Sequence, residues 1–242
     1  MASQALGLLI AVALVVAAAE ALPGPLDAAW AAAAGIAGAI GIAALYRGLA
    51  SGRMGVVAPV TAVLAASIPV LVGSLVDGPP PPARALGIVL ALVAVVLVSR
   101  ASGPGSGRAA IGLAVLAGTG LGLFAVLVSR VAPGHVFGPL VVARAADLAL
   151  LGAFVALGRQ PWRLPRSVLP LVLLAGVLDL GGNAFFVLSA QAGRLDVAAV
   201  LSSLYPVTTI ILAIIVLRER LVRGQALGVG LAIGAIILIA AG

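Results

Sequence analysis

The sequence predicts an all-α, polytopic membrane protein with nine transmembrane helices. Of its 242 residues, 63% are hydrophobic and only 9% are charged, whereas about 25% of the residues of a typical soluble domain are charged. The mean hydropathy is +1.30. Apolar runs of roughly 20 residues, enough for a helix to cross a ~30 Å hydrocarbon core, alternate with short segments rich in Pro and Arg. A chain of this composition has lipid as its main solvent.

Each predicted helix is an apolar run that ends where helix-breaking or charged residues begin. The linker VDGPPPPARA (76–85) contains four successive prolines, which cannot continue a helix. The linker SRASGPGSGR (99–108) is the most flexible by composition, and we place the boundary between two halves of the chain there. The nine predicted spans are 4–22, 27–46, 54–76, 83–99, 109–130, 136–158, 167–189, 196–217 and 223–241.

The composition excludes several functional classes. The chain has no cysteine and a single histidine, His135, so thiolate chemistry and histidine clusters for metals are excluded and no cofactor is expected. We interpret His135 as an interfacial residue. The 14 basic residues are all arginine and give a net charge of +7, but they are spread over many short segments and form no nucleic-acid-binding patch. The run GTGLG (118–122) lies within an apolar span, so we do not interpret it as a phosphate loop.

An internal repeat indicates two related halves. A shift of 141 residues aligns the chain with itself without gaps and places Gly52-Arg53 on Gly193-Arg194. Biased composition is the alternative explanation. We expect a four-helix repeat at 1–100, a linker at 101–108 and a five-helix repeat at 109–242. Two consecutive units of five helices enter the membrane from opposite sides, as in the inverted repeats of many secondary transporters.

The first helix of the first unit is missing from this pattern. Either the coding sequence starts upstream or the protein is a true nine-helix form. A cleaved signal peptide is a further alternative for the first 22 residues, but no basic residue precedes Arg47. Alternate inter-span segments hold ten arginines on one side of the membrane and three on the other. Positive charge favours the cytoplasm, so we expect the N-terminus inside and the C-terminus outside.

Three charged residues lie deep within predicted spans, away from their ends: Arg144, Asp147 and Asp179. Together they would cost on the order of 8–10 kcal/mol if they faced lipid, so they must face protein or water. Arg144 and Asp147 are three residues apart on one helix face, and we expect them to pair. Asp179 is then the unpaired carboxylate, suited to take up a proton or to meet a cationic substrate, with Asn183 one turn further along. The alternative is a buried ion network that only fixes helix packing.

Further polar residues and glycines mark helix contacts. Ser202, Tyr205 and Thr209 share one face beside Pro206, where a kink can line a cavity, although such hydroxyls also bridge neighbouring helices. We predict a transport pathway formed by Asp179, Asn183, Arg144, Asp147, Ser202, Tyr205 and Thr209. We expect five glycines to permit close helix packing: Gly35, Gly38, Gly41, Gly181 and Gly182.

The segment 181–242 resembles the EamA-type drug/metabolite transporter superfamily. The resemblance lies in the helix that ends near Gly193, LSSLYP (201–206), Glu219 and the closing run GQALGVGLAIGAIILI. ALYRGLASGRMGVVAPV (44–60) resembles the same domain more weakly. Two features depart from the family pattern: Arg218 precedes Glu219 where Gly is usual, and the family usually has ten helices with both ends in the cytoplasm.

These observations predict a secondary-active transporter that carries a small metabolite or drug-like solute across the cell membrane by alternating access. Its partners would be a small-molecule substrate and the lipid bilayer, and a coupling proton and a homodimer are open alternatives. One rival function is a non-transporting scaffold or subunit of a larger complex. The other is an intramembrane enzyme acting on lipid, for which the sequence offers no clustered acid, base or nucleophile, so we expect no enzyme.

Overall fold

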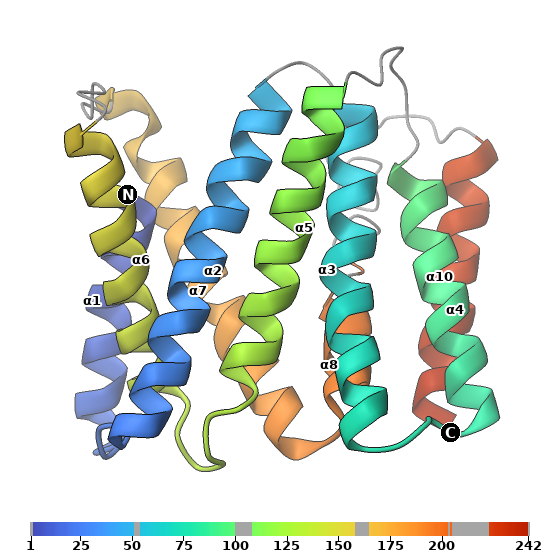
Figure 1. The fold of residues 1–242 in the computed structure, drawn as a ribbon, viewed down its shortest axis with the longest axis horizontal. Coiled ribbons are helices and arrows are strands. Elements are labelled where there is room, and N and C mark those ends of the chain that lie inside the picture. The colour runs from blue at the N-terminus through green and yellow to red at the C-terminus, as the bar shows by residue number, and fades with distance from the viewer. Residues whose placement is uncertain are drawn as a thin grey trace. The chain divides into compact units, whose positions relative to one another are not determined.

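The computed structural model describes residues 2–50, 54–99, 108–157, 165–202, 204 and 223–241. Within these residues all regular structure is helical, which confirms the predicted all-α class (Figure 1). The helices are α1 (Ala2–Ala17), α2 (Pro25–Ala50), α3 (Met54–Val76), α4 (Pro82–Ser99), α5 (Arg108–Val128), α6 (Phe137–Leu157), η1 (Arg166–Val168), α7 (Leu169–Ala192), α8 (Leu195–Ser202) and α10 (Arg223–Ala241).

Most of these bounds lie within a few residues of the predicted spans, because prolines and charged residues end the apolar runs. The largest difference among fully described helices is at α1, which was predicted to reach residue 22. The backbone N–H of Glu20 donates to the carbonyl of Val15 at 3.0 Å, and that of Ala19 donates to Val16 at 3.2 Å. With Ala19 at a φ of 49°, this is a Schellman motif, which ends the helix and frees Glu20 for another role.

In the part of the chain that the structure describes, four helices are long and apolar enough to cross a membrane: Pro25–Ala50, Ala109–Val128, Phe137–Leu157 and Leu169–Ala192. Four shorter apolar helices accompany them among the described residues. The exposed surface of α7 is itself apolar, with Leu171, Leu178 and Phe185 all more than 60% exposed. A surface of this kind is stable against lipid and not against water. That all nine predicted spans cross a membrane stays a prediction, and the span 196–217 is described only at its first residues.

The chain divides into two compact units, and each unit draws on both halves of the sequence. Unit 1 comprises residues 1–39 and 124–192, and unit 2 comprises residues 40–123 and 193–242. The repeats predicted at 1–100 and 109–242 therefore contribute helices to both units. Their boundaries stay a prediction, because compactness in space does not test similarity along the chain.

In unit 1, α1 packs against α6 and α7. The carboxylate of Glu20, just after α1, accepts hydrogen bonds from the backbone N–H groups of Val136, Phe137 and Gly138 at 2.8–3.0 Å. A carboxylate at this place satisfies donors that have no partner within the helix and complements the positive end of the helix dipole. Because the end of α1 meets the start of α6, the two helices are antiparallel.

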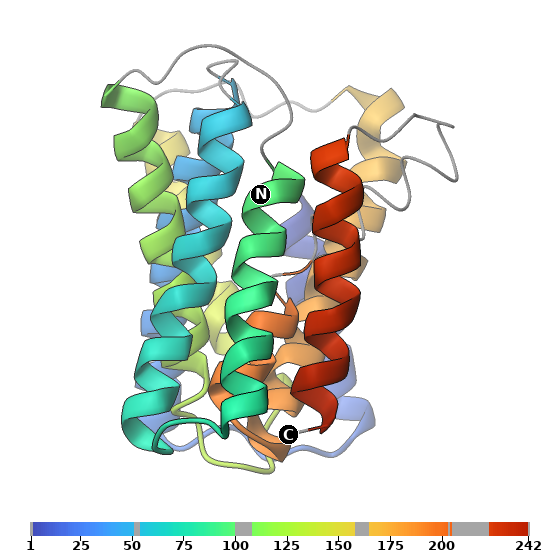
Figure 2. The same ribbon diagram turned by 90° about the vertical axis from the view of Figure 1, so that its right-hand side faces the viewer.

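In unit 2, α4 packs along α10, and α3 packs against α8 and α4. Figure 2 shows α4 and α10 side by side over their length. A Cβ on Gly87, early in α4, would lie 2.8 Å from Ile239, late in α10, so these two helices are also antiparallel. Their contact is made of small and branched residues, among them the fully buried Ala91 and Ala235.

The predicted role of the glycines is confirmed at three positions and wrong at two. A Cβ on Gly35 would collide with the backbone of Ala143 in α6, and one on Gly38 would lie 3.2 Å from the Phe124 ring. A Cβ on Gly41 would lie 2.8 Å from the backbone nitrogen of Leu121. By contrast, a Cβ on Gly181 or Gly182 would meet no atom of the described residues within 4 Å. A glycine in an apolar helix therefore does not by itself indicate a close helix contact.

Candidate functional site

The three charged residues deep within the predicted spans come together in unit 1. Arg144 of α6 forms an ion pair with Asp179 of α7, with 2.5 Å between Nη1 and Oδ2. The prediction that Arg144 pairs with Asp147 and leaves Asp179 unpaired is wrong. Of the two carboxylates near Arg144, Asp147 has no salt bridge among the described residues, and its buried Oδ1 has no hydrogen-bond partner among them.

The direction of helical side chains explains this choice of partner. Side chains in a helix lean toward its N-terminus, so the long side chain of Arg144 extends away from a residue three positions later. Ion pairs within one helix are also more favourable when the acidic residue precedes the basic one in sequence than in the reverse order. Arg144 therefore reaches across to α7, although Asp147 is the nearer partner in sequence.

The ion pair lies between the interior and the surface of the unit. The side chain of Arg144 is 6% exposed and that of Asp179 is 40% exposed. Asp147 is also buried, with 6% of its surface exposed. Burying ionised groups in an apolar environment is unfavourable unless they are paired and hydrogen-bonded. One guanidinium and two carboxylates leave this cluster with one negative charge in excess when all three are ionised.

Helix α1 contributes two residues that the sequence prediction missed. Gly7 lies against the guanidinium, where a Cβ would be 3.5 Å from Cζ of Arg144. Gln4, one turn earlier, is only 7% exposed, and its Oε1 has no hydrogen-bond partner among the described residues. The signal was present in the sequence, because Gln4 is an uncharged polar residue at the start of an apolar span.

Of the four other predicted pathway residues, the structure describes two, Asn183 and Ser202. Asn183 is half-buried and follows Asp179 by one turn of α7. Ser202 is exposed at the end of α8 in unit 2. Tyr205 and Thr209 lie outside the described residues. The assignment of these residues to a transport pathway stays a prediction.

Three side chains hold the loop that leads into α6. Besides the Glu20 cap, Oδ1 of Asp27 accepts a hydrogen bond from the backbone of Ala132 at 3.2 Å. Gln191 accepts from the Gly134 backbone at 3.3 Å and donates to the His135 carbonyl at 2.8 Å. These bonds fix the start of the helix that carries Arg144 and Asp147.

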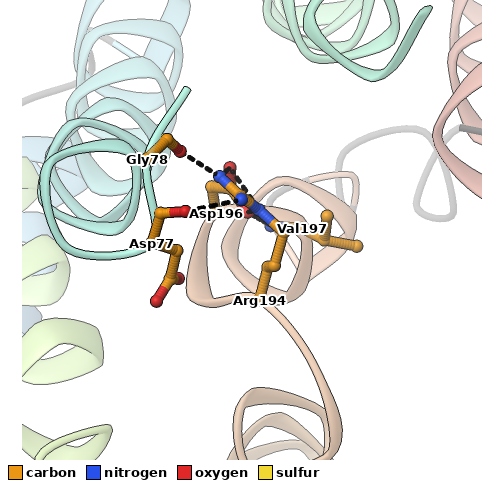
Figure 3. A network of polar contacts seen from close by, with 5 residues as sticks. All are labelled: Asp77, Gly78, Arg194, Asp196 and Val197. Atoms are coloured by element: carbon orange, nitrogen blue, oxygen red, sulfur yellow. Dashed lines mark hydrogen bonds and ion pairs between the residues drawn. The ribbon is translucent and has the colours of Figure 1, made fainter. Parts of the chain in front are cut away.

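A second polar cluster, in unit 2, joins the turn after α3 to the start of α8 (Figure 3). Arg194 donates to both carboxylate oxygens of Asp196, with 2.9 Å between Nη2 and Oδ2. It also donates to the carbonyls of Asp77 at 3.2 Å and Gly78 at 2.6 Å. Asp196 is fully buried. The side-chain hydrogen bond to Asp196 raises the pKa of Arg194 above its ordinary value.

The described residues offer no metal site, since no three His, Asp or Glu side chains among them gather closely enough to hold an ion. The chemistry available in unit 1 is recognition of charge and hydrogen bonding by Arg144, Asp147, Asp179 and Gln4.

Comparisons with known proteins agree with this picture. The model of the EamA-like transporter family matches residues 108–241. A solved structure, described only as "Crystal structure of protein", resembles the chain with a TM-score of 0.77 and 19% sequence identity, over 99% of this chain and 86% of its own. This likeness shows a shared fold over nearly the whole chain. A search of the curated proteins gives no match.

Proposed function

Because the chain belongs to the EamA-like transporter family, we propose that it is a secondary-active transporter that moves a small metabolite or drug-like solute by alternating access. The family consists of membrane transporters and not of enzymes. We further propose that nine spans cross the cell membrane and that two inverted repeats form the molecule. A coupling proton and a homodimer are open alternatives within this function.

The observation that carries the proposal is the charged cluster of Arg144, Asp147 and Asp179. Its helices, α6 and α7, are both apolar enough to cross a membrane. Ionisable residues within such helices are costly and are typical of substrate or ion pathways. A purely structural pair would be equally stable, or more so, as a pair of apolar residues.

The antiparallel packing of matched helices supports the inverted repeat. Under the shift of 141 residues, α1 corresponds to α6, α3 to α8, and α4 to α10. Glu20 joins the end of α1 to the start of α6, and Gly73, late in α3, lies against Asp196, at the start of α8. Gly87 and Ile239 give the same result for α4 and α10. Opposite directions of matched helices are what an inverted repeat requires.

Replacing Asp179 with Asn tests the pathway role. The amide keeps the size of the side chain but removes the charge that pairs with Arg144, so we expect solute flux into proteoliposomes to fall at least tenfold. The assay compares wild type and Asp179→Asn on a panel of radiolabelled amino acids, nucleosides and organic cations.

Asp77→Asn is the matched control, because Asp77 is exposed and only its backbone carbonyl takes part in a contact described above. We expect this variant to transport like the wild type. Equal flux by Asp179→Asn and wild type, with equal amounts of inserted protein, would show that the ion pair only holds helices together.

A further inference from the structure

Three buried polar side chains of unit 1 each have an atom without a hydrogen-bond partner among the described residues. These atoms are Oε1 of Gln4, Nη2 of Arg144 and Oδ1 of Asp147. All three residues are more than nine-tenths buried, with exposures of 7%, 5% and 6%. Buried polar groups in folded proteins nearly always have partners, because an unsatisfied group loses its hydration without compensation. Three such atoms in one small region indicate a ligand.

The packing of α1 against α6 brings the three side chains together. Gly7 lies against the guanidinium of Arg144, which fixes one level at which the two helices face each other. Because the helices are antiparallel, one turn back along α1 corresponds to one turn forward along α6. Gln4 therefore lies at the level of Asp147. Ala11 and Leu140, one turn in the other direction, are both fully buried, as this alignment requires.

The hydrogen-bonding capacity of the three atoms defines the complementary ligand. Oε1 of Gln4 and Oδ1 of Asp147 are acceptors, whereas Nη2 of Arg144 is a donor. The ligand must therefore donate at least two hydrogen bonds and accept one. A primary ammonium group with an oxygen atom on the neighbouring carbon satisfies all three.

The net charge of the cluster narrows the class of ligand further. Asp179 already pairs with Arg144, so the Asp147 carboxylate is the excess charge of the cluster. An opposite charge stabilises a buried ionised carboxylate, and a like charge destabilises it. A monocation neutralises the cluster, a zwitterion leaves its net charge unchanged, and an anion adds a second excess charge.

We infer that Gln4, Arg144 and Asp147 form the substrate-binding subsite for an organic monocation, with a primary ammonium group and a hydroxyl or carbonyl oxygen beside it. This inference rests on the proposed transport function and names the substrate class for it. The ammonium group contacts Asp147 and Gln4, and the oxygen atom accepts from Arg144. Asp179 holds the guanidinium in place and, at 40% exposure, connects the buried atoms with the surface of the unit.

A matched series of three probes tests the inference: phenylalaninol, phenylalanine and phenyllactate. They share one carbon skeleton and are a monocation, a zwitterion and an anion at neutral pH. Their affinities for the full-length protein in nanodiscs are measured by isothermal titration calorimetry at pH 7. We expect phenylalaninol to bind at least tenfold more tightly than the other two.

Two variants separate this subsite from nonspecific binding of amphiphiles. Asp147→Asn removes the charge and keeps an acceptor, and we expect it to weaken phenylalaninol binding at least tenfold. Gln4→Met removes one acceptor without changing charge, and a loss of about threefold is expected. Asp77→Asn, the control, should bind phenylalaninol like the wild type.

Equal or tighter binding of phenylalanine or phenyllactate overturns the inference, as does unchanged phenylalaninol binding in Asp147→Asn. The inference is also overturned if none of the three probes binds at concentrations up to the millimolar range, with each probe in 10-fold excess over the protein. Flux assays distinguish this failure from that of the proposed function. If another solute is transported and its flux depends on Asp179, the proposed transport function stands and only the cation subsite is wrong. If phenylalaninol binds tightly but no solute is transported, the binding site stands and the transport function is wrong.

Discussion

At the scale of single residues, the glycines of this chain fall into two groups with opposite physical roles. Gly35 lets the backbone of α2 approach that of Ala143, the neighbour of Arg144 in α6. A Cβ on Gly182 would meet no neighbour within the described part of the chain. The first glycine is required by packing, whereas the second only lowers the helix propensity of α7.

Replacing Gly35 with Ala should therefore destabilise the protein. The new methyl group has no room beside the Ala143 backbone, and overpacking of this kind costs about 1–3 kcal/mol. The free energy of unfolding of the purified protein in detergent, measured by denaturant titration, checks this. Gly182→Ala is the matched control and should leave stability unchanged or slightly raised. Equal losses in the two variants would contradict the close helix contact.

Which residues a buried charge contacts was only partly predictable from sequence. The cost of exposing charge to lipid correctly predicted that Arg144 and Asp147 are buried within the protein, because that argument needs only their depth in an apolar span. The partner of Arg144 depended on side-chain direction and on which helix lies beside α6, and a one-dimensional pattern contains neither. Gln4 was missed because a single uncharged polar residue near a helix end is common.

At the scale of elements, Arg194 joins two helix ends that are more than 100 residues apart in sequence. Its guanidinium connects the carboxylate of Asp196 in α8 with the carbonyls of Asp77 and Gly78 after α3. Close by, a Cβ on Gly73 would lie 2.9 Å from the backbone nitrogen of Asp196. The packing of α3 on α8 therefore depends on one arginine and on one buried carboxylate.

Arg194→Ala should destabilise the protein by about 2–4 kcal/mol, because it leaves the carboxylate of Asp196 buried without its counter-charge. Thermal unfolding in detergent measures the loss. Arg194→Lys should recover only part of it, since an ammonium group cannot reproduce the planar set of guanidinium donors. The double variant Arg194→Ala/Asp196→Ala should lose less than the sum of the single variants, and an additive loss would show that the pair contributes nothing.

Helix bounds were predicted well where prolines or charged residues end an apolar run, as at α3 and α4. They were predicted less well where the stop signal is a backbone conformation. Helix α1 ends at Ala17 although the residues that follow it, up to Ala19, are all alanine, because Ala19 adopts a left-handed conformation. Alanine is a strong helix former, so no local rule indicates a turn at this position.

At the scale of the whole molecule, each compact unit contains helices from both halves of the sequence. The repeat pattern matches α1 with α6 and α4 with α10, and the antiparallel contacts of these pairs are consistent with the proposed inverted repeat. The pattern did not predict that matched segments pack on each other, because sequence similarity at a fixed shift carries no information about contact.

The orientation of the chain follows from its arginines and from the number of spans. Ten arginines lie in the alternate segments predicted to be cytoplasmic and three in those on the other side, and an odd number of spans places the two ends on opposite sides. Alkaline phosphatase, which is active only outside the cytoplasm, should therefore be active when fused after Gly242. The same enzyme fused within the linker at 101–108 is the control and should be inactive, because that linker is predicted to be cytoplasmic. The reverse pattern would mean that the chain inserts in the opposite orientation, and inactivity at both sites would mean an even number of spans between the linker and the end of the chain.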